Sequence, residues 1–142
     1  MKPLLKATLY FTAAGIVAYW AAVFSGAFPV DELVPGYRTW FLSFPLADFW
    51  IAATSVLAAA LVTANRPLGA IVMAAAGSGL IFLGLNAFAY GFNTGLIYNL
   101  TVDEVIEIAI KVYCLAVGGW LIVSAYRQVA TLSREPISRL GT

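Results

Sequence analysis

The chain has 142 residues, of which 62% are hydrophobic and only 11% charged, and its formal net charge is +1. Soluble domains average about 25% charged residues, so this composition, with a mean hydropathy of +0.90, predicts an integral membrane protein rather than a soluble domain. The small net charge argues against a nucleic-acid partner.

The first apolar run covers residues 4–28, and Lys2 and Lys6 stand at its start. The Ser-Gly-Ala triplet at 25–27 resembles the small-residue cleavage site of a signal peptide. The run is longer than the apolar region of a signal peptide, however. We therefore interpret it as the first membrane-spanning helix.

Residues 28–45 form the first connection, where proline, glycine and charged residues interrupt the apolar pattern. Aromatic residues within it favour a membrane–water interface, and we expect a short helix or turn over residues 39–44. Pro45 suits the first position of the next helix, because a helix does not use the N–H group of its first residue.

Three further apolar runs are predicted to be helices, and they cover residues 46–63, 68–90 and 102–126. Turn-forming and polar residues separate them, and the tail 127–142 is polar. Thr101 and Glu104 form a capping box, which predicts the start of the last helix. The prediction is an all-α fold, a single bundle of four transmembrane helices over residues 1–142.

The positive residues predict how the bundle is oriented. Six of the eight Lys and Arg residues fall on one side of a four-helix arrangement, and these are Lys2, Lys6, Arg66, Arg127, Arg134 and Arg139. The other side has Arg38 alone, and Lys111 lies within an apolar run. Because positive residues mark the cytoplasmic side, we expect a multi-pass protein of the inner cell membrane with both termini cytoplasmic.

The last run carries Glu107 and Lys111, four residues apart. Charges within hydrocarbon are costly and usually face the interior of a bundle or a water-filled cavity. Counting helical turns puts Asp48 and Asn86 at a similar depth, and two tyrosines lie somewhat deeper, where a phenol needs a partner. We therefore predict a ligand-binding pocket between helices, lined by Asp48, Asn86, Glu107, Lys111, Tyr19 and Tyr113.

A purely structural interpretation of these residues is also open. Glu107 and Lys111 could pair within one helix, and the lysine could extend to the interface. Asp48 occupies a first helical turn, where the helix dipole favours a carboxylate, and Asn86 could hydrogen-bond two helices together. If Lys111 instead faces the interior, we expect it to be held by Glu107 and, across the bundle, by Asp48.

The sequence contains no histidine, which excludes haem ligation by histidine, histidine-based zinc sites and histidine general bases. Its single cysteine, Cys114, excludes an intrachain disulfide and a Cys-x-x-Cys pair, and we interpret it as an inert buried thiol. We expect no metal site and no cofactor.

Three short segments carry a family resemblance: Phe-Pro-Leu-Ala-Asp at 44–48, Phe-Leu-Gly-Leu at 82–85 and Tyr-Cys-Leu at 113–115. They resemble a small bacterial family of four-helix integral membrane proteins of unassigned function. The resemblance covers the second to the fourth helix and implies a fold, but no activity, cofactor or site residue. Proteins similar to vitamin K epoxide reductase share the helix count, but this chain lacks their Cys-x-x-Cys.

The function we expect is binding of a small amphipathic or lipid-like molecule in an outer-leaflet pocket between helices. The alternative is an accessory subunit that packs against a larger membrane complex, with a membrane protein as its partner. The least favoured hypothesis is an intramembrane isomerase or hydrolase, in which Asp48, Glu107 and Lys111 would act as acid or base. The sequence leaves open whether the chain is an enzyme.

Overall fold

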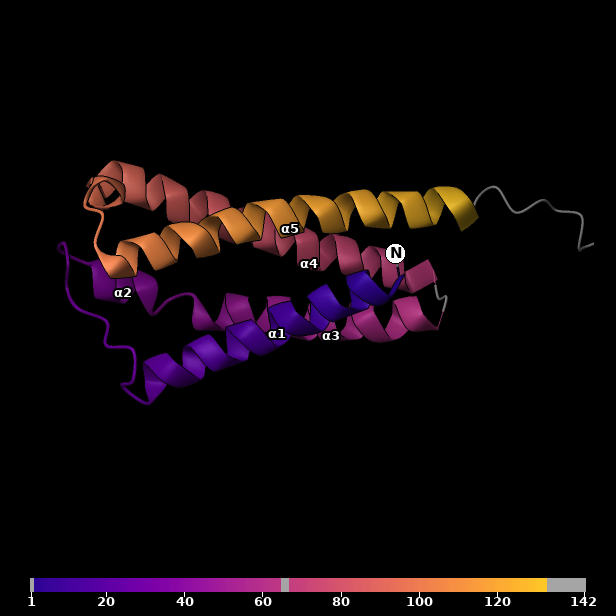
Figure 1. The fold of residues 1–142 in the computed structure, drawn as a ribbon, viewed down its shortest axis with the longest axis horizontal. Helices are drawn as coiled ribbons and strands as arrows, with labels where there is room; N and C mark the ends of the chain where they lie inside the picture. The colour runs from indigo at the N-terminus through magenta and orange to yellow at the C-terminus, as the bar shows by residue number, and fades with distance from the viewer. Residues whose placement is uncertain (1, 65–66, 133–142) are drawn as a thin grey trace, which may run out of the picture.

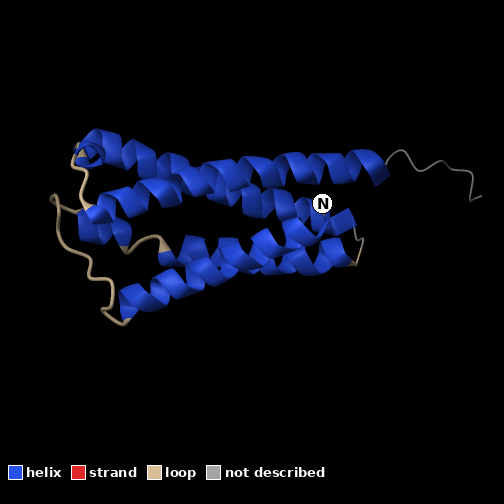
Figure 2. Ribbon diagram, in the orientation of Figure 1, coloured by secondary structure: helices blue, strands red, loops and turns tan. Residues whose placement is uncertain are grey.

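The computed structural model describes residues 2–64 and 67–132, and all the regular structure within them is helical (Figure 2). The four long helices are α1 (Lys2–Phe24), α3 (Pro45–Thr63), α4 (Pro67–Thr94) and α5 (Val102–Leu132). The connections hold two short helices, α2 (Tyr37–Phe41) and the 3₁₀ helix η1 (Leu96–Tyr98). The long helices alternate in direction, so the N-terminus and the end of α5 lie at the same end of the bundle (Figure 1).

The described residues contain four stretches that are helical, long and apolar enough to cross a membrane. These candidate spans are Pro3–Phe24, Tyr37–Val62, Pro67–Thr94 and Val102–Thr131, and the second includes α2 as well as α3. Large apolar side chains lie exposed on their outer surfaces, such as Phe11 on α1, Trp50 on α3 and Phe82 on α4. Apolar surface of this extent is costly in water, whereas hydrocarbon accepts it. The expected four-helix, all-α bundle is confirmed.

Close packing follows the order of the helices along the chain: α1 packs on α3, α3 on α4, and α4 on α5. Figure 1 shows α1 and α3 along one side of the bundle and α4 and α5 along the other. Over the described residues, α1 and α5 do not pack closely on each other. The ring of four helices therefore has one open side, which we call the α1–α5 seam.

A column of glycines on α4 lets α5 come close. Gly77, Gly84 and Gly91 are seven residues apart, about two helical turns, and so share one face. A Cβ atom at Gly77 would lie 2.8 Å from the carbonyl oxygen of Gly118, and one at Gly84 would lie 3.0 Å from the Leu115 side chain. Small residues allow such close contact between membrane helices, so this face of α4 fixes the position of α5.

Two clusters of buried apolar side chains stabilise the bundle. One extends toward the end that holds the N-terminus and includes Leu9 and Leu121, both fully buried. The other lies at the opposite end, which we call the α2 end, and includes Trp20, Tyr37 and Phe41. The space between these two clusters contains the candidate site.

Several helix ends differ from those expected. The first helix ends at Phe24 rather than at residue 28, because Gly26 turns the chain with a positive φ of 78°. Helix α4 continues to Thr94 and α5 to Leu132, so both run past the expected ends at residues 90 and 126, and part of the expected tail 127–142 is helical. The rest of that tail, residues 133–142, lies outside the described residues, as does Arg66.

The short helix expected over residues 39–44 covers Tyr37–Phe41 instead. Gly36 precedes it with a φ of 86°, a conformation that glycine adopts without strain. The Glu32 carboxylate accepts hydrogen bonds from the backbone N–H groups of Gly36, at 2.5 Å, and Arg38, at 3.0 Å. These N–H groups have no partner within the helix, so Glu32 fixes where α2 begins.

Candidate functional site

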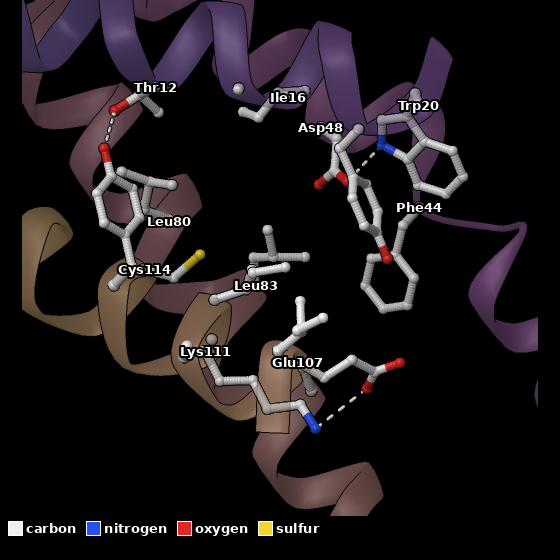
Figure 3. Close-up of a pocket in the computed structure, with 18 of the residues that line it drawn as sticks. Thr12, Ile16, Trp20, Phe44, Asp48, Leu80, Leu83, Glu107, Lys111 and Cys114 are labelled. Atoms are coloured by element: carbon white, nitrogen blue, oxygen red, sulfur yellow. Dashed lines mark hydrogen bonds and ion pairs between the residues drawn. The ribbon is translucent and has the colours of Figure 1, made fainter. Parts of the chain in front are cut away.

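A cavity of about 500 Å³ lies between the two buried clusters (Figure 3). All four long helices and α2 contribute to its lining. Its walls are mainly apolar and include Ile16 of α1 and Leu80 and Leu83 of α4. Cys114 of α5 also lines it and is buried, as expected for a packed thiol.

The cavity opens sideways through the α1–α5 seam. The residues that line it and are also exposed on the side of the bundle include Phe11, Gly15, Ile106 and Ile110. At the edge of this mouth nearer the N-terminal end, beside Phe11, the Tyr113 hydroxyl and Thr12 Oγ1 form a hydrogen bond of 2.7 Å across the seam. The cavity is thus reached from the apolar side surface of the bundle.

An ion-pair cluster on α5 occupies the end of the cavity nearer α2. Lys111 Nζ lies 3.0 Å from Glu104 Oε1 and 3.2 Å from Glu107 Oε2, and Lys111 is only 5% exposed. Spacings of three and four residues place all three side chains on one face of α5. A Cβ atom added to Gly91 of α4 would lie 3.8 Å from this ammonium group, so α4 covers it from the side.

Glu107 connects the ion-pair cluster to α2. Its Oε1 accepts a hydrogen bond of 2.5 Å from the Tyr37 hydroxyl, while its Oε2 faces Lys111. Tyr37 also belongs to the aromatic cluster at the α2 end, where its ring lies 5.9 Å from that of Phe41. The charged residues therefore fix α2 over the end of the cavity.

Asp48 does not pair with Lys111, so this part of the expected arrangement is wrong. Its Oδ2 accepts a hydrogen bond of 2.8 Å from Trp20 Nε1. Side chains on a helix point back toward its N-terminus, so Lys111 reaches Glu104, on the preceding part of its own helix. The expected pairing of Glu107 with Lys111 is confirmed.

Five of the six predicted site residues line the cavity, and these are Tyr19, Asp48, Glu107, Lys111 and Tyr113. Asn86 does not, because α4 turns residues 80, 83, 84 and 87 toward the cavity. At about 100° per residue, Asn86 lies roughly a third of a turn away from them. It is half-buried on another part of the α4 surface.

The sequence interpretation missed four residues whose side chains bond to the predicted site residues, and these are Glu104, Trp20, Tyr37 and Thr12. Glu104 was expected to complete a capping box, and its N–H group does bond to Thr101 Oγ1, at 3.2 Å. Its carboxylate instead pairs with Lys111, which the spacing 104–107–111 on one helix face would have indicated. Trp20 and Tyr37 contact residues 28 and 70 positions away, and no sequence pattern signals such contacts.

The fold and the cavity define a four-helix bundle with a side-opening, mostly apolar internal site. Comparison with protein-family models, curated protein sequences and solved structures finds no match to this chain. The resemblance of residues 44–48, 82–85 and 113–115 to a small bacterial family stays an expectation. Among the described residues, no group of three His, Cys, Asp or Glu side chains is placed to hold a metal ion.

Proposed function

We propose that the chain is a multi-pass protein of the inner cell membrane, with the α2 end outside and both termini in the cytoplasm. Four candidate spans and the surplus of lysine and arginine at the terminal end support this orientation. Asp31, Glu32 and Asp103 lie at the α2 end, near a single arginine. In this orientation the cavity lies in the outer half of the membrane.

We further propose that the protein binds one small amphipathic or lipid-like molecule in this cavity. The observation that carries the proposal is the lateral mouth between α1 and α5, which leads from an apolar surface to a cavity with charged side chains at one end. Ligand cavities typically measure about 300–1,000 Å³, a range that includes this one. An apolar tail fits the walls, and a polar head group fits the end near α2.

The depth of the cavity supports the same ligand class. Its lining on α1 extends from Phe11 to Trp20, which is about 13 Å along a helix. One leaflet contributes about 15 Å to a hydrocarbon core of about 30 Å. A molecule that lies in the outer leaflet with its head group near the interface would match this depth.

Native mass spectrometry of the purified protein tests the proposal. We expect a monomer that retains a small molecule at a stoichiometry near one. A protein that carries stoichiometric partner subunits and no small molecule would instead be an accessory subunit, and that result would overturn the proposal.

A cavity-filling variant provides a sharper test. Gly15 lines the cavity, and a Cβ atom at this position would meet nothing within 4 Å. Gly15→Phe therefore adds an aromatic ring at the mouth, and its Cβ atom causes no clash. Gly119 has equally open surroundings but does not line the cavity, so Gly119→Phe is the matched control. We expect Gly15→Phe to lose the retained molecule and Gly119→Phe to keep it. Equal retention by both variants would place the molecule outside the cavity.

A further inference from the structure

Asp48 has a carboxylate oxygen without a partner. The residue is 7% exposed, and Trp20 Nε1 binds its Oδ2. Its Oδ1 is buried and has no hydrogen-bond partner among the described residues. Figure 3 shows this oxygen directed toward the interior of the cavity, away from Trp20. An unpaired buried acceptor is costly, so the site favours a ligand that brings a hydrogen-bond donor to it.

Aromatic rings surround the same end of the cavity. The aromatic residues that line this end with Asp48 are Tyr19, Trp20, Trp40, Phe41 and Phe44. The rings of Trp20 and Phe41 have centroids 5.4 Å apart, and those of Tyr19 and Trp20 are 5.7 Å apart. The face of an aromatic ring attracts a cation, most strongly in tryptophan. A carboxylate among aromatic rings therefore favours a positively charged group.

The charged side chains around the cavity also favour a cationic head group. Asp48 and Glu107 line the cavity, and Lys111 is the only cationic side chain that does so in the described part of the chain. A third carboxylate, that of Glu104, lies behind Lys111 and pairs with it. The ammonium of Lys111 is already held by Glu104 and Glu107. An anionic head group would find no free cation here, and a cationic one would reduce the excess of negative charge.

We propose that the cavity selects an amphipathic molecule whose head group is a protonated amine bearing at least one N–H, and that this N–H donates to Asp48 Oδ1. The inference rests on the proposed function and adds the head-group chemistry to it. A quaternary ammonium would satisfy the aromatic rings but could not donate to Oδ1. The amine could belong to a free single-chain amphiphile or to a membrane lipid with a primary-amine head group.

The test uses the full chain in a neutral detergent and five single-chain probes below their micellar concentrations. The probes are dodecylamine, N,N-dimethyldodecylamine, dodecyltrimethylammonium, dodecanol and dodecyl sulfate, and tryptophan fluorescence reports binding because Trp20 and Trp40 line the cavity. We expect the two amines to bind about 10-fold or more tightly than the trimethylammonium probe, because only they form the charge-assisted hydrogen bond. Dodecyl sulfate should bind most weakly.

Asp48→Asn keeps the shape of the side chain but removes its charge. We expect it to weaken binding of both amines by about 10- to 100-fold while dodecanol binding changes little, and retained dodecanol binding also shows that the variant is folded. Asp103→Asn is the matched control, because Asp103 is exposed in the first turn of α5 and does not line the cavity. If Asp48→Asn fails to fold, the comparison of dimethylamine and trimethylammonium probes in the unaltered protein still decides the question.

The outcomes separate the two proposals. If no probe binds, the proposed function fails. If dodecanol and dodecyl sulfate bind as tightly as the amines, or if dimethyl and trimethyl probes bind equally, the proposed function stands and the amine site is overturned. Nanodiscs then identify the source: a lipid head group predicts retained phosphatidylethanolamine that dodecylamine displaces, and a free amine predicts dodecylamine binding with no retained phosphatidylethanolamine.

Discussion

Replacing Lys111 by methionine removes the one ammonium group of the ion-pair cluster. It leaves the buried carboxylate of Glu104 and the partly buried carboxylate of Glu107 without a counter-ion. The side chains of Lys111, Glu104 and Glu107 are 6%, 6% and 17% exposed, so water can compensate little of the lost charge. Removing one member of a buried ion pair costs about 3–5 kcal/mol. We expect Lys111→Met to lower the free energy of unfolding by that amount, measured by titration with dodecyl sulfate in mixed micelles.

Lys6→Met is the matched control, since Lys6 lies exposed on α1. Even an ion pair at an exposed position contributes only about 0–1 kcal/mol to the free energy of unfolding. Adding Glu104→Gln and Glu107→Gln to Lys111→Met should recover at least about half of the loss, because the uncompensated charges are then gone. Using Asp48→Asn in place of Glu104→Gln should recover much less, because Asp48 does not bond to Lys111. A loss no larger than that of Lys6→Met would refute the burial of this ammonium, and equal recovery by both combinations would refute the pairing with Glu104.

Two further predictions concern packing and orientation. A Cβ atom at Gly118 would lie 2.7 Å from the Gly77 carbonyl oxygen, so Gly118→Ala should cost about 1–3 kcal/mol of unfolding free energy, through overpacking at the α4–α5 contact. Gly119→Ala meets nothing within 4 Å and should be neutral or stabilise α5 by up to about 1 kcal/mol, so equal loss in both variants would contradict the described contact. For orientation, a reporter that is active only in the cytoplasm should be active when fused after Thr142. Activity only from a periplasmic reporter at that position would overturn the proposed topology.

The sequence predicted the bundle because long apolar runs leave few alternatives to spanning helices. It predicted helix ends less well. The expected third helix ends at residue 90, whereas in the structure Gly91 lies within α4 and beside Lys111. Helical spacing also predicted the contact between Glu107 and Lys111, since both belong to one helix. Contacts between helices depend on how each helix is rotated about its axis. That rotation is estimated from the helical period, and a small error in the period changes which side chains are expected to face each other. The partner of Asp48 was therefore missed.

The order of packing in the bundle has a consequence for how the chain assembles and where it first comes apart. Each close helix contact joins helices that follow one another in sequence, so each can form locally as successive hairpins. The bond between Thr12 and Tyr113 is different, because it joins residues 101 positions apart and has no close helix packing on either side. It closes only after the hairpins have met, together with the edge contact between the Phe11 and Tyr113 rings, whose centroids lie 6.1 Å apart. Local fluctuation at this bond, far less costly than global unfolding, would then widen the mouth of the cavity at its edge nearer the N-terminal end.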